Sequence, residues 1–282
     1  MNSESPRPVL IHYHVFKNAG TTVESILREN FGSRFCRFEG DEYSTVLTNE
    51  SLLSFLDSNP NIRALSSHHL RPPKPIAGGI ALYDLVLLRH PLDRLASTYD
   101  FYRRSAIDDD PLGRMSREMD LPQFCAALIE RFPHVVNNAQ VNYMNGGNKI
   151  PRESDLRRAI NGMKQLSVLG VTDLFDMCMV SAECVLGREF GNLDFSYTSQ
   201  NVSPGRLRSL PERLQNIEEA CGSQLYERLV KLNKLDIDLF DWTTNELQQR
   251  SQQIANFRER MNDFAARCKA LVGAVTNASK LG

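Results

Sequence analysis

Residues 9–22 read VLIHYHVFKNAGTT, an apolar run that ends in a lysine and a short polar turn with one glycine. This order predicts a strand, then a loop that can cradle a phosphate group, then a helix. The lysine comes before the glycine, whereas in the Walker A loop, GxxxxGK[ST], it follows the glycines. The stretch therefore indicates a site for a phosphorylated nucleotide that is used for something other than triphosphate hydrolysis.

The segments around this stretch alternate between strand and helix patterns. We expect strands at 8–16, 62–68, 80–89 and 166–171. We expect helices at 21–30, 49–57, 91–104, 120–132, 153–164, 173–186 and 211–233. Alternation of this kind is typical of a parallel sheet with right-handed crossovers and helices on both faces. The sequence therefore predicts a three-layer α/β fold with a central parallel sheet.

The residue types of the turn suit an anion. Gly20 allows the backbone to approach the ligand closely, and Lys17 adds a mobile positive charge. The start of the following helix has unpaired N–H groups, and Thr21 and Thr22 add hydroxyl donors. We expect one of these threonines to cap the helix, with Glu24 in its first turn.

A second segment, LVLLRHPLDRLASTYDFYRR at 85–104, has an arginine where a buried strand is expected to end. Arg89 can clamp a phosphate with two hydrogen bonds, and the hydroxyl of Ser97, eight residues later, can reach another phosphate oxygen. Both segments are expected at the carboxyl edge of one sheet, where α/β proteins bind ligands. Two anion sites at one edge suit a nucleotide that is phosphorylated at both ends.

Composition narrows the classes of protein. The chain of 282 residues is long enough for one large α/β domain, and its formal charge of −1 gives no general affinity for nucleic acid or anionic membranes. No run of about 18 apolar residues and no signal peptide is found, so no membrane span is expected. The six cysteines form no CxxC pair. Buried, reduced thiols in a cytoplasmic protein are the expectation.

The C-terminal tail has an apolar stripe of helical spacing between residues 245 and 277. Such a stripe predicts one long helix with a single apolar face. That face either packs on the chain's own domain or mediates a homodimer. We therefore expect a main domain at 1–243 and a helical extension at 244–282.

With these features in place, a family resemblance becomes specific. HVFKNAGTT at 14–22 resembles the 5′-phosphosulfate loop of sulfotransferases that use 3′-phosphoadenosine 5′-phosphosulfate (PAPS), and RHPLDRLASTY at 89–99 resembles their 3′-phosphate segment. The chain is most similar to the carbohydrate branch, which includes the 2-O-sulfating enzymes of glycosaminoglycans, and to its bacterial relatives. Looser matches are NNAQVNY at 137–143, LGVTDLFD at 169–176 and LYERLVKLNKLDIDLFDW at 225–242.

The resemblance implies a P-loop-like fold, PAPS as co-substrate and its desulfated form, 3′-phosphoadenosine 5′-phosphate (PAP), as product. The 3′-phosphate is assigned to Arg89 and Ser97, and the segment 201–208 is a third contact with Arg206 as its candidate. The implied 5′ contacts are Lys17, Asn18, Ala19, Gly20, Thr21 and Thr22.

Sulfuryl transfer needs a base for the acceptor hydroxyl, and histidine has a suitable pKa. Related 2-O-sulfotransferases carry a histidine followed by an apolar residue after the corresponding strand, which favours His69 as the base and leaves His68 as the alternative. His14 is a competitor because it is close to the loop. A carboxylate such as Glu24 or Asp100, or no residue at all, remains a further reading.

No metal is expected, because Lys17 can neutralise the charge that grows on the leaving group. The acceptor is expected to be a hydroxyl of a saccharide or glycosylated small molecule. Arg94, Arg103 and Arg104 either bind an anionic acceptor or are surface charges. Two other functions stay open: a nucleotide-dependent kinase with an atypical loop, and a non-catalytic nucleotide-binding scaffold.

Overall fold

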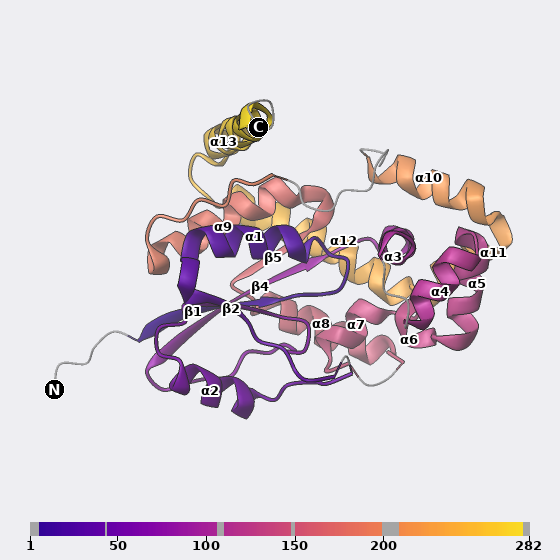
Figure 1. Cartoon of the computed structure of the whole chain (residues 1–282), viewed down its shortest axis with the longest axis horizontal. Coiled ribbons are helices and arrows are strands. Elements are labelled where there is room, and N and C mark those ends of the chain that lie inside the picture. The colour runs from indigo at the N-terminus through magenta and orange to yellow at the C-terminus, as the bar shows by residue number, and fades with distance from the viewer. Residues whose placement is uncertain (1–5, 43, 106–109, 148–149, 199–208, 279–282) are drawn as a thin grey trace. The chain divides into compact units, whose positions relative to one another are not determined.

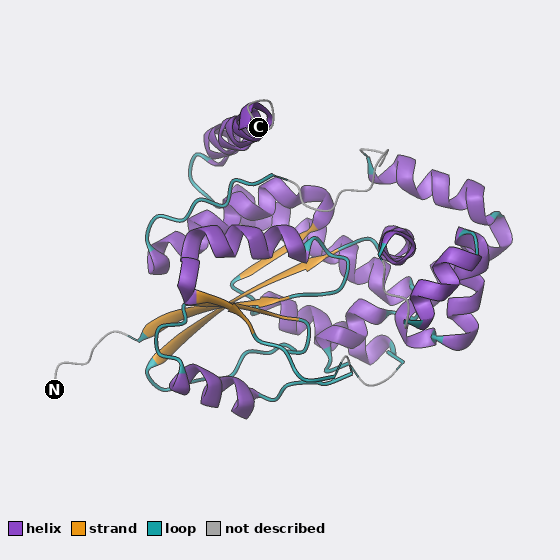
Figure 2. Cartoon of the chain, viewed as in Figure 1, coloured by secondary structure: helices purple, strands orange, loops and turns teal. Residues whose placement is uncertain are grey.

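The structure, a computed structural model, is an α/β protein with a five-stranded parallel sheet flanked by helices (Figure 2). It describes residues 6–42, 44–105, 110–147, 150–198 and 209–278. The backbone forms two compact units. The first comprises 1–87, 162–201 and 243–282, and the second comprises 88–161 and 202–242. The expected α/β class and parallel sheet are thereby confirmed.

The sheet has the strand order β2-β3-β1-β4-β5. The central strand β1 pairs in parallel with β3 and with β4, so that Tyr13 lies beside Ser67 on one side and Val86 on the other. The carboxyl ends of these three strands therefore lie at one edge. The strands are β1 (Arg7–Tyr13), β2 (Phe35–Arg37), β3 (Ala64–Ser67), β4 (Ile80–Leu88) and β5 (Val168–Val171).

Helices α1 and α2 cover opposite faces of the sheet (Figure 1). The connection from β1 to β2 contains α1 and crosses the sheet past β3 to its edge. The connection from β2 to β3 contains α2 and runs back in the opposite direction. Right-handed crossovers place two such helices on opposite faces. The helices assigned wholly to the first unit are α1 (Gly20–Phe31), α2 (Asn49–Ser58), α9 (Phe175–Phe190) and α13 (Phe257–Ala278).

Helices of the second unit are mostly short. They are α3 (Pro91–Arg104), α4 (Pro111–Glu118), α5 (Leu121–Arg131), α6 (Pro133–Val136), α7 (Ala139–Met144), α10 (Leu210–Cys221) and α11 (Ser223–Leu232). Two helices run from one unit into the other: α8 (Glu153–Lys164) and α12 (Lys234–Gln252).

Two long helices expected from the sequence are broken. The predicted helix 211–233 is α10 and α11, which are separated by Gly222 with φ of 72°. The predicted tail helix ends at Gln252 and resumes at Phe257, after Asn256 with φ of 57°. A left-handed residue cannot continue a right-handed helix, and apolar periodicity does not report such a break.

The last helix, α13, packs on α9 within the first unit. Phe264 is fully buried, and the guanidinium of Arg267 donates to both carboxylate oxygens of Glu183 at 3.0 Å. Within the ranges given above, none of the helices combines the length and the apolar character that crossing a bilayer requires.

Candidate functional site

The turn that joins β1 to α1 has an unusual backbone. Lys17 and Ala19 adopt left-handed conformations, with φ of 66° and 61°. The buried Asn18 between them donates from Nδ2 to the carbonyl of Leu87 at 2.9 Å, which ties the turn to the end of β4. Left-handed backbone costs a non-glycine residue about 1–2 kcal/mol, and such strain is typical of functional sites. The turn therefore has a fixed shape at the carboxyl edge of the sheet.

Helix α1 begins at Gly20, one residue earlier than expected, and its cap differs from the prediction. The N-cap is Ala19, which makes no side-chain capping bond, so the expected cap by Thr21 or Thr22 is wrong. Glu24 lies beyond the first turn and is buried. The tight turn brings the chain into the helix without a side-chain cap, and helix geometry leaves the first amides of α1 without an acceptor inside the helix.

Glu24 is the centre of a buried hydrogen-bond network. Its Oε1 accepts from Nδ1 of His14 at 3.0 Å and from the hydroxyl of Ser66 at 3.0 Å. Its Oε2 accepts from Nε of Arg37 at 2.7 Å and also contacts Nη2 of Arg37. Burial opposes ionisation of Glu24, but the hydrogen bonds from His14 and Arg37 outweigh it and lower its pKa to about 2. Glu24 is a fixed negative charge and a poor proton acceptor.

His14 lies against the backbone of Gly20. A Cβ atom at Gly20 would be 1.9 Å from Nε2 of His14 and 2.0 Å from its Cδ2. The glycine is therefore required by a side chain of the preceding strand end. The sequence predicted a close backbone approach at this position, but of a ligand rather than of a histidine.

Three histidine rings are stacked beside the turn. The ring of His14 lies 3.8 Å from that of His68 and 5.2 Å from that of His12, measured between centroids. Burial lowers the pKa of His14, although the hydrogen bond to Glu24 acts in the opposite direction. Burial also lowers the pKa of His12, and the charge of His14 lowers it again, so that it lies well below the ordinary value. Among the residues that the structure describes, no three His, Cys, Asp or Glu side chains are grouped so that they could hold a metal ion.

His68 and His69 have different partners on their Nδ1 atoms. Nδ1 of His68 lies 2.9 Å from Oε1 of Glu39, and the backbone N–H of His68 also donates to this carboxylate. Nδ1 of His69 accepts from the amide of Gly40 at 2.7 Å, although Oε2 of Glu39 lies 3.4 Å away. A carboxylate partner places the proton of His68 on Nδ1 and leaves Nε2 as an acceptor. The amide partner places the proton of His69 on Nε2.

The two rings also differ in exposure. The side chain of His68 is 38% exposed and that of His69 is 11% exposed. Burial opposes ionisation of Glu39, but the hydrogen bonds from His68 keep its pKa below the ordinary value. His68 with Glu39 thus has the arrangement of a base and the carboxylate that orients it.

In the second unit, Arg89 follows the end of β4 directly and is buried. Its Nε donates to Oδ2 of Asp93 at 2.7 Å, and Nε of Arg213 donates to Oδ1 of the same carboxylate at 3.0 Å. Ser97 is half-buried on α3. The segment 201–208 with Arg206 lies outside the described residues. No local pattern in the sequence pointed to Arg213, which lies 120 residues from its partner.

The backbone of Arg89 is held by Gln140, from the loosely matching segment 137–143. Its amide donates to Oε1 of Gln140 at 3.0 Å, and its carbonyl accepts from Nε2 at 2.8 Å. The buried Asp236 accepts from the amides of Gln140 and Val141 at 3.0 and 2.7 Å. This joins two segments singled out by the resemblance, and both of them position the strand end.

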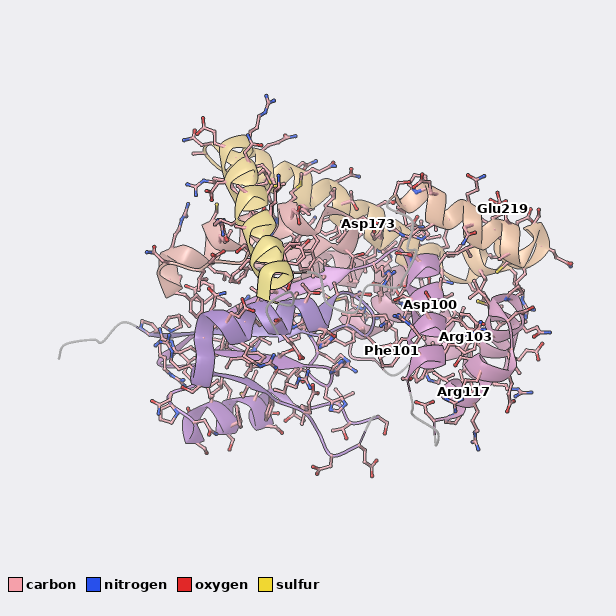
Figure 3. All side chains as sticks on the ribbon, turned by 45° about the horizontal axis from the view of Figure 1, so that its top comes forward. Asp100, Phe101, Arg103, Arg117, Asp173 and Glu219 are labelled. Carbon is pink, nitrogen blue, oxygen red and sulfur yellow. The ribbon has the colours of Figure 1, made fainter. Side chains whose placement is uncertain are left out.

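The other arginines considered from the sequence make local contacts. Arg94 is buried and donates to the carbonyl of Val135 at 2.7 Å. Arg103 and Arg104 are exposed on α3, where they bond the hydroxyl of Tyr99 and the carbonyl of Asp100; Figure 3 labels Arg103 beside Asp100 on this helix. Arg94 is therefore not a surface charge, whereas Arg103 and Arg104 are.

The residues implied for the two ends of a nucleotide fall in different units: 17–22 in the first, and Arg89 with Ser97 in the second. The described site residues that sequence reasoning missed include Arg37, Glu39, Gln140, Arg213 and Asp236. Each acts through a tertiary contact that no local pattern reports.

No protein-family model matches the chain. An uncharacterised protein from Archaeoglobus fulgidus is similar to it, with 26% identity over 244 residues. The match covers 83% of this chain and 95% of that protein. The similarity spans nearly the whole relative, but at this identity it assigns neither a family nor an activity.

Proposed function

We propose that the chain is a sulfotransferase with a P-loop-like fold. It moves the sulfuryl group of PAPS to a hydroxyl of a carbohydrate or glycosylated acceptor by in-line displacement. The observation that carries this proposal is the strained turn 17–20, in which a lysine precedes the start of α1 at the carboxyl edge of the sheet. Backbone amides and a lysine at this place suit the phosphosulfate, and the lysine-first order argues against ATP hydrolysis.

The chemistry follows from charge and proton transfer. Nε2 of His68 accepts the proton of the acceptor hydroxyl. The hydroxyl oxygen forms a bond to sulfur as the bond from sulfur to the 5′-phosphate oxygen breaks. Lys17 neutralises the charge that develops on the departing phosphate. Positioning and electrostatic stabilisation account for most of the rate in related phosphoryl transfers. The resemblance favoured His69 as the base. The hydrogen-bond partners of the two rings favour His68 instead, because Nε2 of His69 carries a proton and cannot accept another.

Ligand binding is the first test. Calorimetric titration of the protein with PAP should give saturable binding, and ATP with magnesium should bind far more weakly. The reverse preference would support a nucleotide-dependent kinase instead. Arg89→Ala should weaken the binding of PAP much more than that of adenosine 5′-phosphate. Equal losses of affinity for the two ligands would show that Arg89 does not contact the 3′-phosphate.

Turnover is the second test, with labelled PAPS and a panel of saccharide acceptors. Lys17→Ala should lower turnover by a hundredfold or more, on the order of the loss of one transition-state donor. The exposed Lys231→Ala is the matched control and should turn over normally. Wild-type rates for Lys17→Ala would exclude this lysine from the mechanism.

The base is tested by a pair of variants. His68→Ala should lower the chemical rate by about 10²–10⁴-fold, with little change in PAP affinity. His69→Ala should affect the rate less, and the exposed His134→Ala serves as the control. If His69→Ala alone lowers the rate, the assignment of the base is reversed.

A further inference from the structure

His14 has one ring nitrogen that the network around Glu24 does not use. Its Nδ1 donates to Oε1 of Glu24, which leaves Nε2 as the lone-pair nitrogen. Among the hydrogen bonds of the residues described, none involves Nε2 of His14. The residue is 7% exposed, and the contact with Gly20 places Nε2 against the first residue of α1. The edge of the His14 ring that carries Nε2 thus lies beside the start of the helix that follows the turn.

The surroundings of this ring decide its protonation. Burial, with His68 nearby, favours the neutral ring in the free protein, while the carboxylates of Glu24 and Glu39 favour the cation. Glu24 is already compensated by Arg37. The charged or titratable groups around His14 are His12 on β1, His68 after β3, Glu24 on α1 and Glu39 after β2. Arg37 on β2 bonds the other carboxylate oxygen of Glu24.

We propose that His14 is an anion-binding residue of this turn and acts in its protonated form. When a phosphosulfate or phosphate occupies the start of α1, Nε2 takes up a proton from solvent and donates the new N–H to an anion oxygen. Nδ1–H stays on Glu24, so the imidazolium lies between the carboxylate and the ligand. An opposite charge within a few Å favours the charged form of a group. This inference rests on the proposed function, because it requires the turn to bind anions.

The consequence is a binding equilibrium coupled to a proton. Because the complex binds more protons than the free protein, affinity falls as pH rises through the range between the pKa values of His14 in the two states. With one proton involved, the dissociation constant rises by up to about tenfold per pH unit. Neither Lys17 nor the backbone amides give such a slope near neutral pH.

Calorimetry with adenosine 5′-phosphosulfate tests this directly, because that ligand has no 3′-phosphate and no group that titrates near neutral pH. At one pH, the binding enthalpy is measured in buffers with different heats of ionisation. A slope between zero and one proton taken up is expected for the wild type. His14→Gln should bind without proton uptake, whereas the matched variant His68→Gln should retain it.

Nitrogen NMR of the histidine rings gives a second readout that needs no variant. On addition of adenosine 5′-phosphosulfate, Nε2 of His14 should change from an unprotonated to a protonated shift. Binding without proton uptake, or uptake lost in His68→Gln but kept in His14→Gln, overturns the inference and leaves the proposed function standing. A wild type that binds neither adenosine 5′-phosphosulfate nor PAP refutes the proposed function itself.

Discussion

Replacing Gly20 with alanine tests the architecture of the turn. The new Cβ would lie 1.9, 2.0 and 2.5 Å from three ring atoms of His14, closer than side-chain carbons come in real structures. The backbone of Gly20 is helical, so its φ is no reason for a glycine here. The ring cannot simply move aside, because it is buried and bonded to Glu24. Alanine therefore forces either the ring or the start of α1 to shift.

The size of the effect follows from these contacts. If the ring moves, loss of the hydrogen bond between His14 and the ionised Glu24 costs about 1.5–3 kcal/mol. If the helix start moves instead, the cost is a similar ~1–3 kcal/mol. Alanine regains up to about 1 kcal/mol, because it has a higher helix propensity than glycine. We expect Gly20→Ala to lower the free energy of unfolding by about 1–2 kcal/mol in urea titrations.

Two further variants make the result specific. Gly187→Ala in α9 is the matched control, because a Cβ there meets nothing within 4 Å, and it should be neutral or slightly stabilising. In the double variant that combines Gly20→Ala with His14→Ala, the new methyl group has space, so the two costs should not add. Costs that add within about 0.5 kcal/mol, or a Gly20→Ala protein as stable as the wild type, would refute the reasoning.

Three other predictions concern buried charges and thiols. At pH values above its ordinary pKa of 4.5, Glu24 stabilises the fold. Because its pKa in the folded protein is about 2, that contribution should disappear as pH falls from 4.5 toward 2. Glu24→Gln should therefore flatten this part of the profile of unfolding free energy against pH. Asp93→Ala leaves two buried guanidiniums without their shared carboxylate and should cost about 3–5 kcal/mol in urea unfolding, whereas a loss below about 1 kcal/mol would contradict a buried ion pair. Burial raises the pKa of the Cys178 thiol to about 12, so iodoacetamide at pH 8 should label Cys184 and spare Cys178, and peptide mapping that finds both labelled equally would disprove this.

The sequence predicted the frame of the fold well. The strand at 80–89 and the helix at 91–104 are found at Ile80–Leu88 and Pro91–Arg104. Both have strong local signals, a continuous apolar run and a proline at the first helical position. The first strand was predicted too long, because Val15 and Phe16 are apolar but, like His14, lie beyond the end of β1 at Tyr13. Hydrophobicity does not report a backbone that turns left-handed shortly afterwards.

The candidate site was predictable only in part, because its residues are held by contacts distant in sequence. Lys17 and Gly20 are visible in one short stretch. Glu39 becomes relevant only because β2 and β3 are neighbours, which brings its carboxylate to His68, 29 residues away. Arg213 meets Asp93 across 120 residues. Side chains that orient others depend on the tertiary fold, which one sequence does not supply.

The strained turn has its own physical logic. Left-handed conformations at Lys17 and Ala19 cost about 1–2 kcal/mol each, so they persist only where other contacts hold them. The bond from Asn18 to Leu87 and the contact of Gly20 with His14 supply such restraints. Both are made by the protein itself, so the turn has its shape before any ligand arrives. Under the proposed function, the anion would bind without the entropic cost of ordering the loop, so the interactions of Lys17 and the amides would contribute to affinity without that cost.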